Sequence, residues 1–584
     1  MSNNKGVCRQ AREPSGQRSS GMARRNRAAV AAGILTTLFW LANRSAYEGW
    51  FMDDDLDNLD RVIRRSAMEL VAGFCTPLAL EFNDRPTGHL IYWLLSRMVG
   101  LEYGWYVGAM HVLHLVNVLL VWVLLRRLGA GERGAGVGAL LFAFHMACFD
   151  AYWKPMFVFD VVATLFYLLA LLACLSPRWW LALIPFWLSY KGKELAVTLP
   201  AVLLLYEYTL GERRWRRVIP FAAVAASFTL QGVLRNAGTD NAYTLRFTPA
   251  AVWTTLGFYS SKILLLPWAG LLLIPAGWLA KDARVRFGLL AIPVLLGPLW
   301  FLPGRLFGVY LYLPLVGLAV AAAFASERWR WWVVAGLFAV WLPWNYQILR
   351  EGRKSALTVG PENRAYVEQL GEFAAKNAEL RTILFDGGPT EMNQWGVVGA
   401  LRWYYRHPDL RTAAVNSEEA KEMLETGRIA VLGWDRARRR LIAAVRDEEQ
   451  PDVGYIEMTE GLRVWQFGEG WFPLEGGFRW MAPRAWARLR RPAGVEEFEV
   501  RVNLGPQQYK DRGRVGLELW IDGESQGVRE FERPGWSSQR WAVKGTGEAQ
   551  VVEVELRAVE AYRPTNGDPR VFGAAITGFG FVSR

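Results

Sequence analysis

Long apolar stretches fill most of residues 28–349 and constrain the fold more than any other feature of the sequence. Because a helix needs about 20 apolar residues to cross the hydrocarbon core of a bilayer, we predict about eleven membrane-spanning helices. Their predicted ranges are 28–44, 105–125, 134–149, 157–175, 179–190, 195–210, 218–234, 265–280, 287–303, 308–325 and 331–349.

Short basic clusters follow alternate predicted spans, as the positive-inside rule expects of cytoplasmic loops. Examples are Arg126-Arg127, Arg213-Arg214 and Arg284–Arg286. This alternation predicts a multi-pass protein of a bacterial inner or plasma membrane, with a cytoplasmic N-terminus and extracytoplasmic C-terminal domains. The basic stretch 1–27 is predicted to be a disordered cytoplasmic tail.

The net charge of +12 is explained by these clusters, which lie between apolar spans. A basic protein could instead bind nucleic acid, but no nucleic-acid-binding motif accompanies the basic residues. We therefore expect the lipid bilayer as a partner and no nucleic acid.

The composition changes near residue 350, where ordinary globular composition replaces the apolar stretches. Alternating helix and strand patterns predict a small extracytoplasmic α/β domain at 350–455. Short alternating strands with Gly and Pro turns predict a jelly-roll-like β-sandwich at 460–584. The predicted fold class is a polytopic α-helical membrane domain at 28–349 followed by these two domains.

Aromatic residues are frequent at the start of the predicted β-sandwich. Trp471 and Trp480 are candidates for stacking on sugar rings, which would make this domain carbohydrate-binding. The alternative is that they are core aromatics of the sandwich.

The stretch GWFMDDDLDNLDRVIRR (49–65) places five aspartates directly after the first predicted span. Adjacent carboxylates repel one another, and crowding raises the pKa of at least one of them unless a cation or a donor compensates. We therefore predict that Asp53, Asp54 and Asp55 have a function beyond helix structure, and the family resemblance described below makes them the catalytic candidates.

A structural explanation covers the other two aspartates of this stretch. Residues 56–70 have the apolar spacing of an amphipathic helix. Acids are favoured in the first turn of a helix, and Asp57 can pair with Arg61 one turn later. The same explanation accounts for Asp60.

Further polar residues lie at the ends of predicted spans. In Asp84-Arg85-Pro86, the arginine is a candidate for binding an anionic group; the alternative is a local ion pair, with a helix starting at Pro86. His111, His114 and Asn117 share one face of an apolar helix and are expected to bond to neighbouring helices. The remaining candidates are Asp160, Lys191, Lys193, Glu194, Arg305 and Tyr310.

Together these pieces resemble multi-span GT-C glycosyltransferases, and most closely their protein O-mannosyltransferase-like (family 39-like) branch. The matching stretches, in the order of the family, are Asp53-Asp54-Asp55, Arg85-Pro86, His114–Asn117, FAFHMACFD followed by FDVVATLFYLLALL, GKELAVTLP and VYLYLPL.

The resemblance covers residues 28–349 and has two departures. Val309 and Val158 stand where the family usually has arginine. Anion binding would therefore have moved to Arg305 or Arg235. The preference for a particular sugar donor is left open.

The resemblance implies a membrane glycosyltransferase that moves a sugar, hexose- or mannose-like, from a polyprenyl-phosphate donor. The acceptor would be an exported protein, lipid or polysaccharide at the outer membrane surface. Asp54 or Asp53 would be the general base that deprotonates the acceptor hydroxyl. A divalent metal, Mg²⁺ or Mn²⁺, at Asp53, Asp54 and Asp55 is an alternative role for these acids.

The leaving lipid phosphate would need cationic groups around it. The resemblance implies this role for Arg85, Lys191, Lys193 and Arg305. The substrate-binding set is completed by Asp84, Asp160, Glu194 and Tyr310.

Two rival functions are a transporter or lipid flippase and a non-catalytic glycan-binding membrane scaffold. Transporters tend to have internal repeats and polar groups near the membrane midplane. No clear repeat is present here, and most charge lies at the predicted outer boundary. Retention of Asp53–Asp55 and Arg85 argues against a scaffold.

Overall fold

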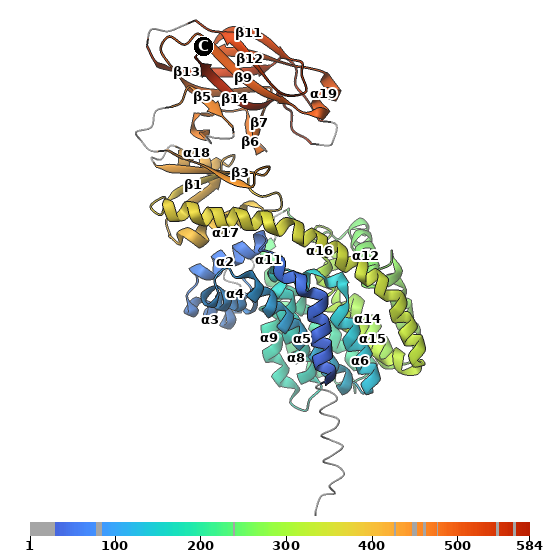
Figure 1. The fold of residues 1–584 in the computed structure, drawn as a ribbon. Helices are drawn as coiled ribbons and strands as arrows, with labels where there is room; N and C mark the ends of the chain where they lie inside the picture. The colour runs from blue at the N-terminus through green and yellow to red at the C-terminus, as the bar shows by residue number, and fades with distance from the viewer. Residues whose placement is uncertain are drawn as a thin grey trace, which may run out of the picture. The chain divides into compact units, whose positions relative to one another are not determined.

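The structure is a computed structural model that describes residues 30–77, 84–236, 240–424, 428–446, 452–458, 463–475, 477–544, 548–564 and 568–583. The chain forms two compact units (Figure 1). Unit 1 comprises the chain up to Glu48 together with Val71–Gly88 and Glu102–Lys354. Unit 2 comprises Gly49–Leu70, His89–Leu101 and Ser355–Arg584. The predicted tail 1–27 lies outside the described residues.

Unit 1 is helical. It begins with a helix at residues 30–43. The longer helices that follow are α5 (Tyr103–Arg127), α6 (Glu132–Phe144), α7 (Asp150–Trp153), α8 (Val158–Cys174), α9 (Leu183–Tyr190), α10 (Leu199–Thr209), α11 (Ile219–Asn236), α12 (Pro249–Ile263), α13 (Leu273–Leu279), α14 (Ala283–Leu295) and α15 (Pro314–Arg328). Short 3₁₀ turns connect many of them, among them η5 (Glu194–Thr198), η8 (Gly297–Phe301) and η9 (Gly308–Leu311).

Among the residues that the structure describes, four helical segments are long and apolar enough to cross a membrane. They are Tyr103–Arg127, Pro155–Cys174, Ala283–Phe301 and Trp331–Lys376. Large apolar side chains on them are exposed, as lipid-facing residues are: Val112 is 62% and Val340 69% exposed. The chain is thus an integral membrane protein, while the count of about eleven spans and the orientation of the termini stay predictions.

Polar side chains inside α5 bond to neighbouring helices, as predicted. A ring nitrogen of His114 lies 2.7 Å from the hydroxyl of Tyr312, and the other lies 3.1 Å from the carbonyl of Ala143. Asn117 donates to the carbonyl of Val161 and to the same tyrosine hydroxyl. These bonds satisfy groups that would be costly in lipid.

Two segments differ from the prediction. α12 occupies residues for which no helix was predicted, because its sequence mixes apolar residues with Thr and Ser. α16 (Trp331–Lys376) is one helix of 46 residues, where a span ending at 349 and a separate later helix were expected. Its internal Gly352 packs against the ring of Phe149 and so serves close contact, not a helix end.

Unit 2 contains the aspartate-rich helix α2 (Asp53–Arg64) and a small α/β sheet. The sheet has the order β2-β1-β3-β4. Its strands are β1 (Thr382–Asp386), β2 (Arg411–Ala414), β3 (Ile429–Asp435) and β4 (Arg440–Arg446), with helices α17 (Gln394–Tyr405) and α18 (Glu418–Leu424) between them. β1 runs parallel to β2 and β3, and β4 is antiparallel to β3.

Two antiparallel sheets form a β-sandwich after the α/β sheet. Their strand orders are β11-β10-β13-β8 and β12-β9-β14-β7-β6, with β5 also paired to β14. The strands are β5 (Tyr455–Glu457), β6 (Trp471–Glu475), β7 (Phe478–Met481), β8 (Arg484–Arg491), β9 (Glu497–Leu504), β10 (Val515–Ile521), β11 (Glu524–Phe531), β12 (Gly535–Ala542), β13 (Gln550–Ala558) and β14 (Ala575–Val582). Alternate buried residues such as Leu517, Leu519 and Phe498 form its core.

The tryptophans considered for sugar stacking pack on protein groups. Trp471 stacks on Phe579 with ring centroids 5.1 Å apart, and its indole N–H donates to the carbonyl of Trp486. Trp480 lies 4.6 Å from the ring of Phe572. These contacts match the packing alternative, and sugar binding by either ring stays a prediction.

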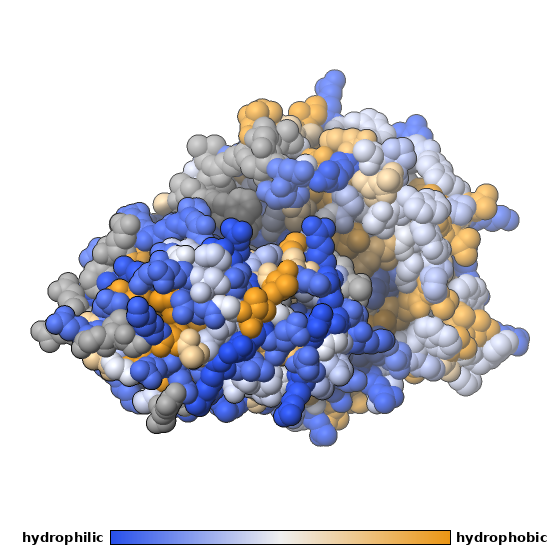
Figure 2. Space-filling model, turned by 90° about the horizontal axis from the view of Figure 1, so that it is seen from above, coloured by the Kyte–Doolittle hydropathy of each residue, from blue (hydrophilic) through white to orange (hydrophobic). Residues whose placement is uncertain are grey.

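The nearest part of the molecule in Figure 2 is covered mainly by hydrophilic residues.

Candidate functional site

The predicted substrate-binding residues of unit 1 form a connected cluster. Arg85 lies directly before α4 (Pro86–Met98), which starts at the proline as predicted. Its guanidinium contacts both carboxylate oxygens of Glu194, at 3.0 and 3.1 Å. Arg85 therefore forms an ion pair with a residue 109 positions away in the sequence, whereas only a local pair was considered above. Such a bidentate arrangement fixes the plane of the guanidinium.

Glu194 is held in its charged form. Burial opposes ionisation, but the positive charges of Arg85 and Lys193 outweigh it and lower the pKa of this carboxyl. The side chain is 58% exposed, so its charge is accessible at the surface of the cluster.

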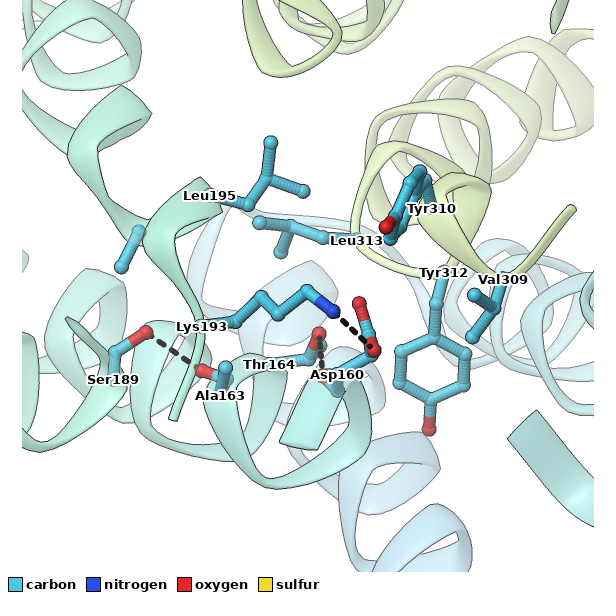
Figure 3. A pocket seen from close by; sticks show the side chains of 11 residues that line it. Asp160, Ala163, Thr164, Ser189, Lys193, Leu195, Val309, Tyr310, Tyr312 and Leu313 are labelled. Carbon is cyan, nitrogen blue, oxygen red and sulfur yellow. Dashed lines mark hydrogen bonds and ion pairs between the residues drawn. The ribbon is translucent and has the colours of Figure 1, made fainter. Parts of the chain in front are cut away.

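Lys193 extends from the loop before η5 toward α8, where its ammonium lies 3.1 Å from Asp160 (Figure 3). The two side chains are 12% and 6% exposed. On its other side, the ammonium lies 5.0 Å from the ring centroid of Tyr310, which comes from η9. Lys193 therefore connects two segments that are far apart in the sequence.

Arg305 extends the cluster through Tyr310. Its guanidinium donates to the tyrosine hydroxyl at 3.3 Å and lies over the rings of Tyr243 and Phe307, 4.4 and 4.7 Å from their centroids. Tyr259 donates to the carbonyl of Arg305 and so holds its backbone. Within the described ranges, no carboxylate forms an ion pair with Arg305, so its positive charge is not neutralised by the protein there.

Glycines allow these segments to come close. A Cβ added to Gly88 would lie 2.2 Å from the ring of Phe159 at the start of α8. A Cβ on Gly192, between the two lysines, would lie 2.8 Å from the hydroxyl of Thr87. Both contacts bring the loop bearing Lys193 and the start of α4 against the helix that carries Asp160.

Lys191 and Asp84 are two further predicted substrate-binding residues of unit 1. Lys191 is 3% exposed and follows α9, with its ammonium 5.7 Å from the ring centroid of Trp187. Burial lowers the pKa of Lys191, and the negative charge of Asp84 opposes that shift. The side chain of Arg235, the second candidate for anion binding, lies outside the described part of the chain.

The predicted catalytic aspartates lie in unit 2, in the first turn of α2. The predicted helix began at residue 56; the observed helix begins at Asp53 and ends at Arg64, before α3 (Ala67–Cys75). All three acids therefore gain from the helix dipole, which was expected to favour only the later ones. Asp57 pairs with Arg61 at 2.9 Å, as predicted.

Asp55 is fully buried and has a structural role. One of its carboxylate oxygens accepts the backbone N–H of Met52 at 2.8 Å, which is half of a capping box, and the other accepts the hydroxyl of Tyr92. Burial, with smaller contributions from the charges of Asp54 and Asp53, raises the pKa of Asp55 to about 7 against the lowering effect of these hydrogen bonds. A side chain with no exposed surface cannot contact a substrate.

Asp53 and Asp54 are bonded by side chains from the N-terminus of α17. Asn393 donates to the buried carboxylate of Asp53. The indole N–H of Trp395 donates to Asp54 at 3.0 Å. Asp54 is exposed and Trp395 is 50% exposed, so this pair is open to solvent.

Two glycines of α17 bring it against α2. A Cβ on Gly396 would lie 2.7 Å from the Cα of Asp53, and one on Gly399 would lie 2.5 Å from the carbonyl oxygen of Leu56. One turn later, Arg402 lies 3.3 Å from the buried carboxylate of Asp60. The C-terminal half of the chain thus contributes to the environment of Asp53, Asp54 and Asp60.

The three adjacent aspartates do not form a shared ligand set. Successive residues of a helix point about 100° apart, and here Asp53 and Asp55 are directed to Asn393 and Tyr92. Among all described residues, no three His, Cys, Asp or Glu side chains are grouped closely enough to hold a metal ion. The Mg²⁺ or Mn²⁺ role stays a prediction without support from this geometry.

Several residues of these clusters were not identified from the sequence. Tyr243 and Phe307 flank Arg305, and Asn393 and Trp395 bond the aspartates. Phe307 lies two residues from Arg305 and could have been considered from the sequence. Tyr243 is separated from Arg305 by three α-helices, and Asn393 and Trp395 are more than 300 residues from the aspartates, so a single sequence carries no spacing signal for them.

No protein-family model matches the sequence, and no curated protein matches it significantly. Among solved structures, ArnT from Cupriavidus metallidurans in the apo state aligns with a TM-score of 0.47 and 14% identity, over 72% of this chain and 98% of ArnT. ArnT bound to undecaprenyl phosphate aligns with a TM-score of 0.46 and 14% identity, over 72% and 99%. Arabinofuranosyltransferase AftD from Mycobacteria aligns with a TM-score of 0.42 and 11% identity, over 95% of this chain and 58% of AftD. With TM-scores below 0.5, these alignments do not assign the chain to a fold family.

Proposed function

We propose that this protein is a membrane glycosyltransferase of the GT-C type that transfers a sugar from a polyprenyl-phosphate donor to an exported acceptor. The observation that carries the proposal is the cluster around Lys193 and Arg305. It gathers cationic side chains from three separate segments of unit 1, and one of them, Arg305, has no ion-pair partner among the described residues. A cation flanked by aromatic rings and left without a carboxylate is suited to bind an anionic group.

The phosphate of the donor would bind Arg305 and Lys193. During transfer, the bond between the anomeric carbon and the phosphate oxygen breaks, and the phosphate leaves with an additional negative charge. Fixed cations stabilise that charge without reorganisation. Arg85 is largely engaged by Glu194, so it would support the site by its charge, with Lys191 and Asp84 further from the reacting atoms.

The general base would be Asp54. The acceptor hydroxyl attacks the anomeric carbon, the new carbon–oxygen bond forms, and the proton passes to a carboxylate within hydrogen-bond reach. Asp54 is the exposed member of the three, whereas Asp55 is enclosed and Asp53 is held by Asn393. Trp395 would orient the Asp54 carboxylate through its indole N–H.

The identity of the sugar, of the acceptor and of the family branch rests on the sequence resemblance alone. It favours a hexose such as mannose and the protein O-mannosyltransferase-like branch, with a protein, lipid or polysaccharide as acceptor. These parts of the proposal are separable from the reaction class, and the experiment below tests each donor in turn.

The test is sugar transfer in membranes that contain the full chain, supplied with radiolabelled polyprenyl-phosphate sugars. We expect Asp54→Asn to lower transfer by about 10²–10⁴-fold, the contribution of a general base. Arg305→Gln should lower it by about 10²–10³-fold, as loss of a donor to a developing anion does.

Matched controls are Asp57→Asn, one turn along α2, and Arg246→Gln, whose partner Asp240 is exposed. Both should retain transfer at equal expression. Transfer that is unchanged in Asp54→Asn would overturn the assignment of the base. Absence of transfer from every donor by wild type would remove the glycosyltransferase proposal and favour a transporter or a scaffold.

A further inference from the structure

A cavity of about 280 Å³ lies between α6, α14, α15 and α16 within unit 1. Its wall is apolar, with Leu141, Leu289, Leu318 and Phe338 from the four helices. The one hydroxyl in the lining, that of Ser326, already donates to the carbonyl of Ala323 at 2.8 Å. Two tryptophans, Trp329 and Trp341, also line the cavity, so its wall offers few polar groups to hold ordered water.

The cavity is open at the outer surface of the helix bundle. Two of its lining residues, Trp329 and Leu337, are 45% and 52% exposed. In a membrane the surroundings are lipid chains, which are as apolar as leucine. A hydrocarbon chain is therefore the ligand that this wall accepts.

One end of the cavity carries a concentration of positive charge. The loops 126–133, 281–286 and 327–330 meet there, as shown by a bond from Arg133 to the carbonyl of Trp329 at 2.9 Å and an ion pair of Arg328 with Asp282 at 2.9 Å. These loops contain eight basic and three acidic residues. An anionic head group is thus complementary to this end.

Arg133 links the charged end to the apolar wall. It lies on α6 at positions i−4 and i−8 from Val137 and Leu141, which both line the cavity, so the three share one helix face. Arg133 is exposed, and no acidic group forms an ion pair with it in the described ranges. A ligand with a chain in the cavity would present its head group to this guanidinium.

The polyprenyl-phosphate site of the proposed function lies at the other end of the same helix bundle. Tyr310 and Leu313 precede α15, whereas Ser326 and Trp329 lie at its end. The 15 residues of α15 span about 22 Å at 1.5 Å per residue. A lipid bound by its head group at Tyr310 would belong to the opposite leaflet.

We propose that this cavity binds one acyl chain of an anionic diacyl phospholipid, whose phosphate contacts Arg133. The lipid comes from the leaflet at the basic end, predicted to be cytoplasmic. This site is independent of the glycosyltransferase proposal, because it needs no substrate and no catalytic residue.

The first test compares lipid retained by the purified full chain in detergent, measured by mass spectrometry. Wild type should retain an anionic phospholipid through detergent washing. Ala325→Phe places a ring in the cavity and should remove most of that lipid. Val340→Phe adds the same ring on the exposed side of α16 and should retain it. Equal retention in all three proteins would overturn the proposal.

A second test changes no residue of the cavity wall. It therefore does not depend on whether the protein still folds with the added phenylalanine. Phosphatidylglycerol titrated into delipidated wild type should raise the Tm, and phosphatidylcholine with the same chains should raise it less. Arg133→Gln should weaken the phosphatidylglycerol effect about fivefold in midpoint concentration, the factor for one basic residue near an anionic lipid. Arg178→Gln, in another exposed basic loop, should not change it.

The same titration distinguishes the lipid classes. A Tm increase with phosphatidylcholine equal to that with phosphatidylglycerol would contradict a role for the head group. An increase with polyprenyl phosphate that is lost in Arg133→Gln would contradict the phospholipid and assign the cavity to the donor lipid.

Discussion

Asp55 illustrates how burial separates chemically identical residues. It carries the same carboxyl group as Asp54, one position away, yet it is enclosed and bonded to Met52 and Tyr92. The exposed Asp54 can meet a substrate, whereas Asp55 stabilises the start of α2. A group of adjacent acids in a sequence therefore need not act as one group.

The raised pKa of Asp55 predicts a pH-dependent stability. The folded protein prefers the protonated carboxyl, since its pKa rises from 3.8 in the unfolded chain to about 7. This contribution is fully present below pH 4 and is lost as the pH rises through 7. It should amount to roughly 2–4 kcal/mol of unfolding free energy.

Thermal unfolding of wild type and Asp55→Asn at pH 5 and pH 8 checks this prediction. The neutral amide cannot ionise, so Asp55→Asn should lose less stability than wild type over this interval. Asp57→Asn, a partly exposed neighbour on α2, should behave as wild type does. An identical loss of stability between pH 5 and pH 8 in Asp55→Asn and wild type would refute the raised pKa of Asp55.

At the scale of elements, glycines determine which helices meet. Gly396 and Gly399 of α17 face the backbone of α2, and Gly88 and Gly192 face residues of α8. None of these glycines has the positive φ that would make it a turn residue. These glycines therefore serve the close packing of helices.

Gly399→Ala should loosen the contact of α17 with α2. The added methyl group would lie 2.5 Å from the carbonyl oxygen of Leu56, so the helices must separate. We expect a loss of about 1–3 kcal/mol in unfolding free energy, typical of overpacking. The measurement is the Tm of the full chain.

Gly336→Ala is the matched control, because this glycine of α16 has open space around its Cβ position. It should be neutral or raise stability by up to about 1 kcal/mol through the entropy of the unfolded chain. A Tm loss in the control as large as that in Gly399→Ala would mean that the effect is not specific to the α2 contact.

At the scale of the whole molecule, the α/β sheet and the β-sandwich of unit 2 are joined by a buried ion pair. Asp386, at the end of β1, accepts the backbone N–H of Leu474 at 3.1 Å and pairs with Arg479 of β7. Arg479 also donates to the carbonyl of Phe472 at 2.9 Å. The side chains of the pair are 1% and 3% exposed, so the two sheets are fixed to each other.

Asp386→Ala should therefore destabilise unit 2 by about 3–5 kcal/mol, because it leaves the charge of Arg479 buried and unpaired. Replacing both residues, as in Asp386→Leu with Arg479→Met, should recover much of the loss. Asp568→Ala removes a more exposed pair with Arg570 and should cost less than about 1 kcal/mol. Thermal unfolding and limited proteolysis of the full chain provide the comparison.

The sequence by itself predicted a membrane region built of apolar helices and the side chains that the proposed function uses. Apolar length and basic flanks are local properties, so the helices of unit 1 and the candidates Arg85, Lys193 and Arg305 could be identified along the chain. Strand patterns likewise predicted a β-rich C-terminal region.

Only the tertiary structure decided which groups each candidate contacts and how deeply it is buried. The pairing of Arg85 with Glu194, the isolation of Arg305 from carboxylates and the burial of Asp55 all depend on contacts between segments distant in sequence. Such contacts set charge and accessibility through burial and neighbouring dipoles, which no local pattern of residues encodes. For the same reason, Trp395 bonds Asp54 only because α17 packs against α2.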